Sequence, residues 1–406
     1  MKPEKLYYLY SGSVYFLFNL VFTINGIYFV ESVGLNPLQL VLVGTVVETS
    51  ALLFEIPTGV FADMYGRRRS IITGLTVLGV SFILEGSLPF FWTILLAQII
   101  AGAGYTFLSG ADIAWVADES GIENLDSVLV KGAQFEQIGS LAGIWASVLL
   151  GLFALNFPIV LSGVSMFLLA LILRRIMKEN KFRPKHRGKP LKDFLSTLAD
   201  GLGQIRTSAS LTIILFISLG IGLYSEGFDR LWILKFLSDL RITEEFGLRY
   251  VLWFGVINSG AMVLSIAVLS FLKRLSSRNS SKLLLSYLVI LNTILAVAFI
   301  GFALSGNFPL ALAFYWAGFV ARRNDYPLYA SFINRQIEVS GVRATVISVA
   351  RQFDSLGQII GGPIIGLIAL SSTTLALGVT GLLVFPVVLL YIWLLRRESR
   401  PDRTGK

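Results

Sequence analysis

The sequence predicts an all-α integral membrane protein with twelve transmembrane helices in two pseudo-symmetric six-helix bundles. Three observations support this prediction. Of 406 residues, 55% are hydrophobic and only 15% are charged, whereas a soluble domain carries about 25% charged residues. Apolar windows of roughly 20 residues, the length that crosses a bilayer, recur along the whole chain. A polar sequence pattern also recurs about half a chain apart, as duplicated halves would leave it.

The apolar windows place the spans. The first stretch, from Leu6 to about Val30, is longer than the core of a secretory signal peptide, so we expect it to be retained as the first helix. The predicted helix centres lie near Leu20, Ser50, Gly79, Gly104, Gly139, Phe167, Gly222, Ser259, Thr293, Arg322, Gly357 and Leu383.

Basic residues concentrate in alternate loops. Most of the 34 Lys and Arg lie at the two ends of the chain and in loops near 63–70, 118–131, 174–206, 273–282 and 334–343. The opposite loops hold only Lys235, Arg241 and Arg249. Because basic loops stay in the cytoplasm, we expect a multi-pass protein of the cell (plasma or inner) membrane with both termini cytoplasmic. The net charge of +9 then reflects orientation in the lipid bilayer, and nucleic acid is not an expected partner.

One long basic connection divides the spans into six plus six. We expect an N-terminal bundle over residues 1–178, a cytoplasmic linker over 179–207, a C-terminal bundle over 208–396 and a cytoplasmic tail over 397–406. The basic linker either contacts anionic lipid, at about 1 kcal/mol per basic residue, or only sets the orientation and tethers the bundles. The second interpretation is the simpler one.

The repeated pattern consists of Gln-Phe-acid, then Gly three residues after the acid, then Gly four residues later. It begins at Gln134 in the fifth predicted span and again at Gln352 in the eleventh. Shared polar residues are harder to obtain by chance than shared apolar ones. The pattern therefore favours two related halves.

The loop after the second predicted span carries a short charged motif. It resembles the loop signature of the major facilitator superfamily, G-x-L-A-D-x-x-G-R-K/R. Phe61 stands where Leu is usual, and the matching residues are Gly59, Ala62, Asp63, Gly66, Arg67 and Arg68. A carboxylate at position 63 is spaced to pair with Arg67 one helical turn later.

The resemblance implies a secondary transporter whose two bundles rock around a central site. It further implies that helices one, four, seven and ten line the cavity, and that the loop motif is part of a cytoplasmic gate. Bacterial multidrug or efflux transporters are similar members. The sequence departs from them at Gln98, where drug–proton antiporters often carry Arg, and at Phe271–Arg278, where the second-half loop has no Asp or Gly.

Polar and ionisable side chains inside the spans are candidate sites, because a charge within a bilayer costs about 2.5–3.5 kcal/mol on insertion scales. Acids outnumber bases among them, which suits a proton-binding carboxylate or a cationic substrate. The candidates for substrate binding or coupling are Asn25, Glu48, Asp112, Glu136, Glu226, Asp229, Arg230, Arg322, Asp325, Arg351 and Asp354.

Three pairs are spaced for ion pairing along one helix: Glu226–Arg230, Arg322–Asp325 and Arg351–Asp354. Such pairs either serve the transport site or only neutralise one another where helices pack. Glu226 and Arg322 fall near the middle of their predicted spans. Burial disfavours the charged form of a carboxylate, so Glu226 or Glu48 could exchange a proton as access alternates.

These observations favour a transporter that moves a small molecule by alternating access, with proton-coupled export of amphiphilic, drug-like compounds as the leading hypothesis. Uptake of a nutrient or an organic anion, with the arginines of the tenth span as ligands, is the alternative. An intramembrane enzyme is more remote, because the sequence has no metal-ligand cluster, P-loop or zinc-protease motif. A receptor or a scaffold is also more remote, because it does not account for the many charged residues along the helices expected to line the cavity. We expect no cofactor or metal, a coupling proton gradient and a monomer.

Overall fold

The structure is a computed structural model of the full chain. It describes residues 1–121, 125–182, 203, 208–247, 250–275, 280–337 and 343–398. All of the regular secondary structure in these ranges is helical.

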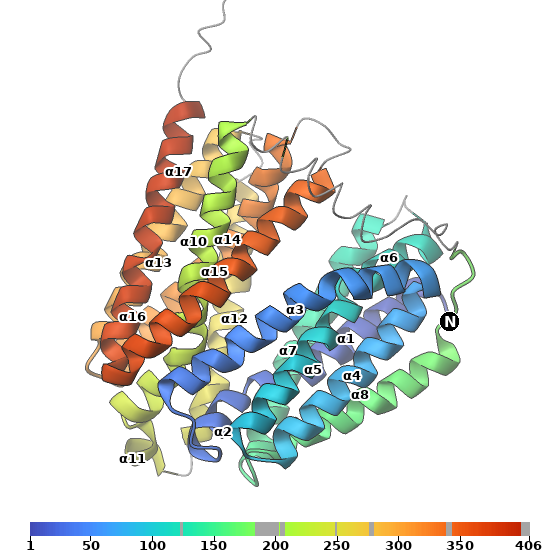
Figure 1. Cartoon of the computed structure of the whole chain (residues 1–406), viewed down its shortest axis with the longest axis horizontal. Coiled ribbons are helices and arrows are strands. Elements are labelled where there is room, and N and C mark those ends of the chain that lie inside the picture. The colour runs from blue at the N-terminus through green and yellow to red at the C-terminus, as the bar shows by residue number, and fades with distance from the viewer. Residues whose placement is uncertain are drawn as a thin grey trace, which may run out of the picture. The chain divides into compact units, whose positions relative to one another are not determined.

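The helices follow one another with short connections, as labelled in Figure 1. The first half contains α1 (Pro3–Phe22), α2 (Asn25–Glu31), α3 (Pro37–Tyr65), α4 (Arg67–Ser87), α5 (Phe91–Leu108), α6 (Ala111–Ser120), α7 (Leu125–Gly151) and α8 (Phe157–Ile176). The second half contains α10 (Ala209–Leu234), η2 (Lys235–Asp239), α11 (Ile242–Phe246), α12 (Tyr250–Leu275), α13 (Ser281–Leu304), α14 (Phe308–Gln336), α15 (Arg343–Ser371), α16 (Thr373–Leu382) and α17 (Val384–Glu398).

These helices form the twelve predicted spans. Ten segments within the described ranges are long and apolar enough to cross a membrane. Three of them contain a break, between α1 and α2, between α5 and α6, and between α16 and α17. The remaining two spans are α7 and α14, which are 27 and 29 residues long but more polar. The predicted all-α, twelve-helix fold is confirmed.

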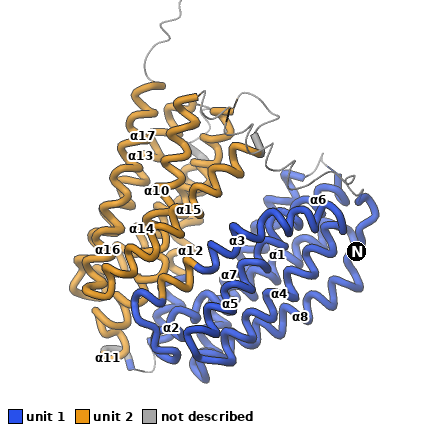
Figure 2. Tube along the Cα trace, in the orientation of Figure 1, with its two compact units in different colours: residues 1–39, 46–191, 246–258 blue, residues 40–45, 192–245, 259–406 orange. Residues whose placement is uncertain are grey.

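Residue contacts divide the chain into two compact units, coloured in Figure 2. Unit 1 comprises residues 1–39, 46–191 and 246–258, and unit 2 comprises residues 40–45, 192–245 and 259–406. Most of the predicted linker and of the predicted tail lies outside the described residues. The predicted boundaries at 178, 207 and 396 therefore stay predictions.

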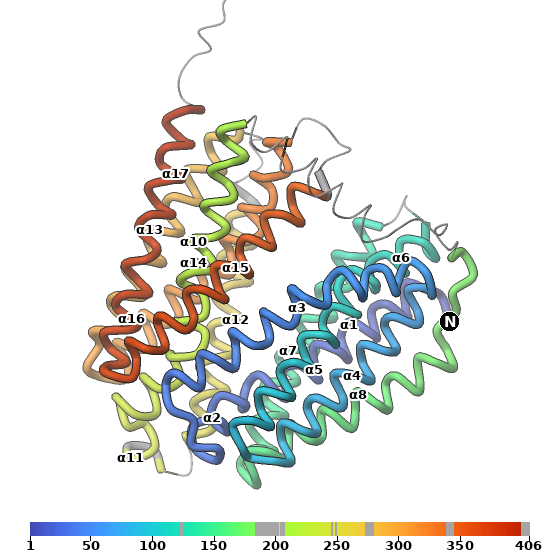
Figure 3. The backbone as a smooth tube through the Cα atoms, in the orientation of Figure 1, coloured from blue at the N-terminus to red at the C-terminus, as the bar shows by residue number. Residues whose placement is uncertain are grey.

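The repeated glycines bring helix backbones into contact in unit 1. A Cβ atom added at Gly139 of α7 would lie 2.1 Å from the carbonyl oxygen of Gly12 on α1. One added at Gly143 would lie 2.4 Å from the carbonyl oxygen of Phe16. Helices α1 and α7 pack side by side (Figure 3). Glycine is required at both positions because any side chain would push α7 away from α1.

The same contact recurs in unit 2. A Cβ atom at Gly357 of α15 would lie 2.3 Å from the carbonyl oxygen of Leu219 on α10, and one at Gly361 would lie 2.3 Å from that of Leu223. The predicted internal repeat thus has a physical basis, because each half uses its glycine pair to pack one helix on the first helix of that half.

Lys235 does not lie in a loop, as the count of basic residues in loops had assumed. The sequence analysis assigned it to a loop, but it begins the π-helical turn η2 and is buried. Its Nζ lies 3.4 Å from Oδ2 of Asp239, one turn later. A lysine at a helix end can be drawn inward when a carboxylate on the same helix neutralises it.

Candidate functional site

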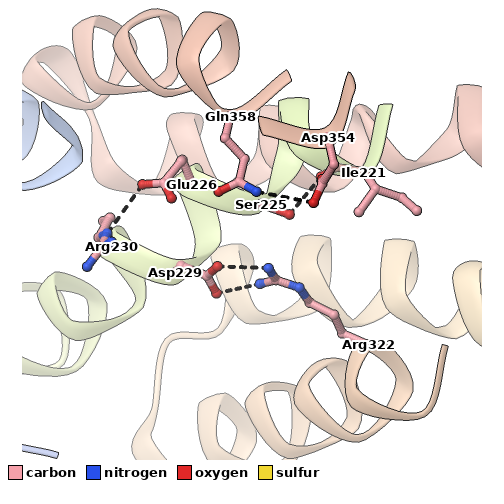
Figure 4. A network of polar contacts seen from close by, with 8 residues as sticks. All are labelled: Ile221, Ser225, Glu226, Asp229, Arg230, Arg322, Asp354 and Gln358. Carbon is pink, nitrogen blue, oxygen red and sulfur yellow. Dashed lines mark hydrogen bonds and ion pairs between the residues drawn. The ribbon is translucent and has the colours of Figure 1, made fainter. Parts of the chain in front are cut away.

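Five candidate residues form a charged network in unit 2 (Figure 4). Helix α10 supplies Glu226, Asp229 and Arg230, which lie three and four residues apart and so share one side of the helix. Helix α14 supplies Arg322, and α15 supplies Asp354. Residues more than a hundred positions apart in sequence thus contribute to one cluster.

Asp229 and Arg322 form a two-pronged ion pair between α10 and α14. Arg322 Nη1 donates to Asp229 Oδ1, and Arg322 Nη2 donates to Asp229 Oδ2 at 2.8 Å. The planar guanidinium matches the carboxylate in this arrangement, which is the stronger and more directional form of a charge pair. The pair fixes the positions of both side chains in the network.

Glu226 and Arg230 form the pair expected from their spacing. Arg230 Nε lies 3.3 Å from Glu226 Oε2. The Glu226 residue is only 2% exposed, so its charge needs a partner. The predicted Glu226–Arg230 pair is confirmed.

Asp354 is bonded to a neutral group. Its Oδ2 accepts a hydrogen bond from Gln358 Nε2 at 3.3 Å, one turn later on α15. Its Oδ1 is buried and has no hydrogen-bond partner among the described residues. The predicted Arg351–Asp354 pair is wrong, because Asp354 turns toward Gln358 while Arg351, one turn earlier, stays exposed.

The predicted Arg322–Asp325 pair is also wrong. Arg322 reaches across to Asp229 on α10, whereas Asp325 accepts a hydrogen bond from Asn292 on α13 at 2.6 Å. Residues three apart on a helix differ in direction by roughly 60°. Here that difference is enough for each side chain to meet a different neighbouring helix.

The candidates of unit 1 lie on four helices. Asn25 begins α2, and Glu48 is half-buried within α3. Glu136 is half-buried on α7. Asp112 lies at the start of α6, where its Oδ1 accepts from the backbone N–H of Ile113 at 2.8 Å. The break before α6 is made by Gly110, whose φ of 73° is a conformation that favours glycine.

A buried carboxylate in unit 1 was missed by the sequence analysis. Glu85 lies near the end of α4 and is 1% exposed. Gln98 Nε2 on α5 donates to its Oε2 at 2.8 Å, and the Tyr28 hydroxyl donates to its backbone carbonyl at 3.1 Å. The short turn at Pro89 is the feature of the sequence that could have revealed this contact. It makes the spans on its two sides antiparallel, so residues shortly before the turn lie beside residues shortly after it.

The loop motif is held by ion pairing and by a helix cap. Arg67 Nη1 lies 2.9 Å from Asp63 Oδ1, so the predicted pair is confirmed. Gly66 has a φ of 104°, which explains a glycine between α3 and α4. Glu179 Oε1 accepts from the N–H groups of Arg67 at 2.6 Å and Arg68 at 3.3 Å. This carboxylate caps the positive N-terminus of α4.

Twelve spans in two halves built on the same glycine contact, with charged groups inside the spans, define a multi-pass membrane transporter. The chain belongs to the Major Facilitator Superfamily, whose family model matches residues 8–353. Members of this family are transporters rather than enzymes, and they sit in the membrane and bind small-molecule substrates.

Similar proteins agree with this assignment. The chain is 26% identical over 367 residues to an uncharacterized MFS-type transporter, YxaM, of Bacillus subtilis (strain 168), covering 87% of this chain and 86% of that protein. The structure of the nucleoside transporter NupG matches with a TM-score of 0.77 at 13% identity, covering 99% of this chain and 100% of that one. A bacterial homolog of the human lysosomal transporter Spinster, in an inward-facing and unoccupied conformation, matches with a TM-score of 0.76 at 13% identity, covering 98% and 99%. The structural matches show the shared fold.

Proposed function

We propose that this transporter exports small amphiphilic cations in exchange for protons. The network of unit 2 contains the carboxylates of Glu226, Asp229 and Asp354 but only the guanidinium groups of Arg230 and Arg322. Acid therefore exceeds base among the charged residues that α10, α14 and α15 contribute to this network. A positively charged substrate would balance that excess.

The observation that carries the proposal is the environment of Asp354. Both arginines of the network are engaged by carboxylates on α10. Asp354 bonds to the neutral Gln358, and its Oδ1 is buried without a hydrogen-bond partner in the described part of the chain. A buried acceptor left unmatched is costly, so a cationic or hydrogen-bond-donating group of a substrate would be stabilised there.

The same geometry weakens the alternative of anion uptake. An organic anion would need an arginine whose donors are available, and the predicted ligands were the arginines of the tenth span. Arg322 directs two donors to Asp229, so an anion would have to displace a two-pronged carboxylate. The exchange of a cation at Asp354 requires no such displacement.

Proton coupling and outward direction complete the proposal. Charged groups placed inside membrane spans mark ion pathways and proton relays in general. Carboxylates that gain a proton lose their attraction for a cation, so protons and cations would compete for the same cluster. A proton gradient directed into the cell would then drive cations outward, with both termini of the chain in the cytoplasm.

Purified protein in liposomes with an imposed pH gradient tests this proposal. The probes are ethidium as a cation, uridine as a neutral compound and para-aminohippurate as an anion. We expect gradient-dependent flux of ethidium alone. The variant Asp354→Asn should lower that flux about tenfold, which corresponds to about 1.4 kcal/mol.

Asp126→Asn is the matched control, because it makes the same chemical change at an exposed acid in the first turn of α7 that is not a candidate site residue. Its ethidium flux should equal that of the wild type. Absence of gradient-dependent ethidium flux, or equal flux in the Asp354→Asn variant, would contradict the proposal. Flux of para-aminohippurate that does not depend on the pH gradient would instead support anion uptake.

A further inference from the structure

A groove in unit 1 is lined by residues of α1, α7 and α8 and has a volume of about 510 Å³. Helix α7 packs mainly on α1, whereas α8 packs mainly on α4, so the consecutive helices α7 and α8 have few contacts with each other. Gly12 and Gly139, which form the close backbone contact between α1 and α7, both line the groove. Because glycine has no side chain, this contact leaves space beside α8 unfilled.

The walls of the groove are apolar side chains that point outward from the unit. Leu9 on α1 is 54% exposed, Ile138 on α7 is 65% exposed and Ile172 on α8 is 53% exposed. From Leu9 to Leu17 the groove follows α1 over about 12 Å, at 1.5 Å per residue. One leaflet contributes about half of a hydrocarbon core that is roughly 30 Å thick. The groove therefore has the polarity and the length to hold a lipid acyl chain within one leaflet.

Each of the three helices carries a basic residue one turn beyond the groove. Lys5 on α1 and Lys131 on α7 come four residues before the first groove residue of their helix, and Arg175 on α8 comes three residues after the last one. This spacing places each base on the side of its helix that lines the groove. Helices α1 and α7 begin, and α8 ends, at the same end of unit 1 (Figure 1). Three positive charges thus lie at one end of an apolar groove.

These three bases are available to a ligand. All of them are exposed, and none forms an ion pair with another residue that the structure describes. An anionic lipid headgroup would meet complementary charge at this end, while its acyl chain follows the apolar walls. A zwitterionic headgroup would gain less, because its own cation offsets its phosphate.

We propose that the groove of α1, α7 and α8 binds one anionic phospholipid, with an acyl chain between α7 and α8 and the phosphate at Lys5, Lys131 and Arg175. The bound lipid contacts both helices that the glycine pair joins, and its binding stabilises the folded unit. All residues of the site belong to unit 1, whereas the charged network belongs to unit 2. The proposal therefore does not depend on which substrate is transported.

Native mass spectrometry of the purified full-length protein tests the headgroup preference. The protein is equilibrated in detergent with phosphatidylglycerol or with phosphatidylcholine. We expect one retained phosphatidylglycerol, held at least tenfold more tightly than phosphatidylcholine. In the double variant Lys131→Gln/Arg175→Gln its affinity should fall roughly 25-fold, or about fivefold for each base removed. Lys282→Gln/Arg396→Gln is the matched control, because it removes two exposed bases from unit 2 and should keep the wild-type affinity.

A second variant tests the groove while keeping all three bases. Ser165 on α8 lines the groove and is half-buried. Ser165→Phe places an aromatic ring where the acyl chain would lie, so phosphatidylglycerol binding should fall at least tenfold. The Tm without added lipid shows whether this variant is folded. Phosphatidylglycerol should raise the Tm of the wild type, and glycerol 3-phosphate, which has the phosphate without acyl chains, should leave it unchanged.

Three outcomes would overturn the proposal. Equal retention of the two lipids by the wild type would mean ordinary contact with the surrounding bilayer. Undiminished affinity in Lys131→Gln/Arg175→Gln would remove these bases from the site, and undiminished affinity in folded Ser165→Phe would place the lipid outside the groove. None of these measurements requires transport, so their failure and the failure of the proposed function are distinguishable.

Discussion

Replacing Gly357 with alanine tests the backbone contact that recurs in the two halves of the chain. The added Cβ would lie 2.3 Å from the carbonyl oxygen of Leu219 and 2.8 Å from the backbone nitrogen of Leu223. Both neighbours are backbone atoms of α10, so no side chain can rotate away to make room. Contact at an ordinary 3.4 Å requires α15 to move by about 1 Å.

The expected loss of stability follows from this displacement. Inserting a methyl group into a well-packed site typically costs about 1–3 kcal/mol. A gap of about 1 Å also forfeits up to roughly half of the dispersion attraction between the separated surfaces. For a unit of about 200 residues, 1 kcal/mol corresponds to roughly 2–4 °C in Tm. The Tm of the variant should therefore fall by roughly 2–12 °C.

The assay is the recovery of folded protein by size-exclusion chromatography after heating in one detergent. Gly378→Ala is the matched control, since a Cβ at this helical glycine of α16 meets nothing within 4 Å. That variant should keep or slightly raise the Tm, because alanine favours helix by about 1 kcal/mol over glycine. Equal Tm values for the Gly357 and Gly378 variants would refute the close-contact reasoning.

Two further predictions concern the polar pairs inside the spans. Arg322→Ala should destabilise the protein more than the double variant Asp229→Ala/Arg322→Ala, because the single change leaves the Asp229 carboxylate without its cation. The side chain of Asp229 is 41% exposed, so the cost lies well below the roughly 3–5 kcal/mol of a fully buried pair. A double-mutant cycle of Tm values that shows simple additivity would contradict this pairing. Glu85→Ala should lower stability by about 1–3 kcal/mol, because it leaves the buried Gln98 amide without its acceptor. Glu85→Gln should lower the stability clearly less in the same heating assay, because its side-chain oxygen can still accept from Gln98. An equal loss of stability in both variants would mean that this hydrogen bond does not stabilise the protein.

The helices could be predicted because the information for each span is local. A run of about 20 apolar residues must cross the bilayer wherever it occurs, and its backbone must satisfy its own hydrogen bonds by forming a helix. Eleven of the predicted centres fall inside helices, and Leu383 falls at the junction of α16 and α17. The glycine repeat was also predictable, since both copies make the same backbone contact.

The candidate site was only partly predictable. Glu226–Arg230 and Asp63–Arg67 are spaced four apart on one helical stretch, and both pairs form. The three-residue pairs around Arg322 and Arg351 do not form, because partners on neighbouring helices or a neutral side chain one turn away compete successfully. Spacing along one helix predicts which side chains are close enough to pair. It does not predict whether a side chain on a neighbouring helix will compete for the same partner.

Hydrophobic length, charge bias and the loop motif specify a twelve-helix transporter of a known superfamily without reference to coordinates. Packing determines the rest: Arg322 pairs with Asp229, Asp325 with Asn292, and Glu85 with Gln98. The reason is that a span's hydrophobicity is a property of consecutive residues, whereas a buried charge is satisfied by whichever helix lies against it. Distances between helices exist only after the chain has folded.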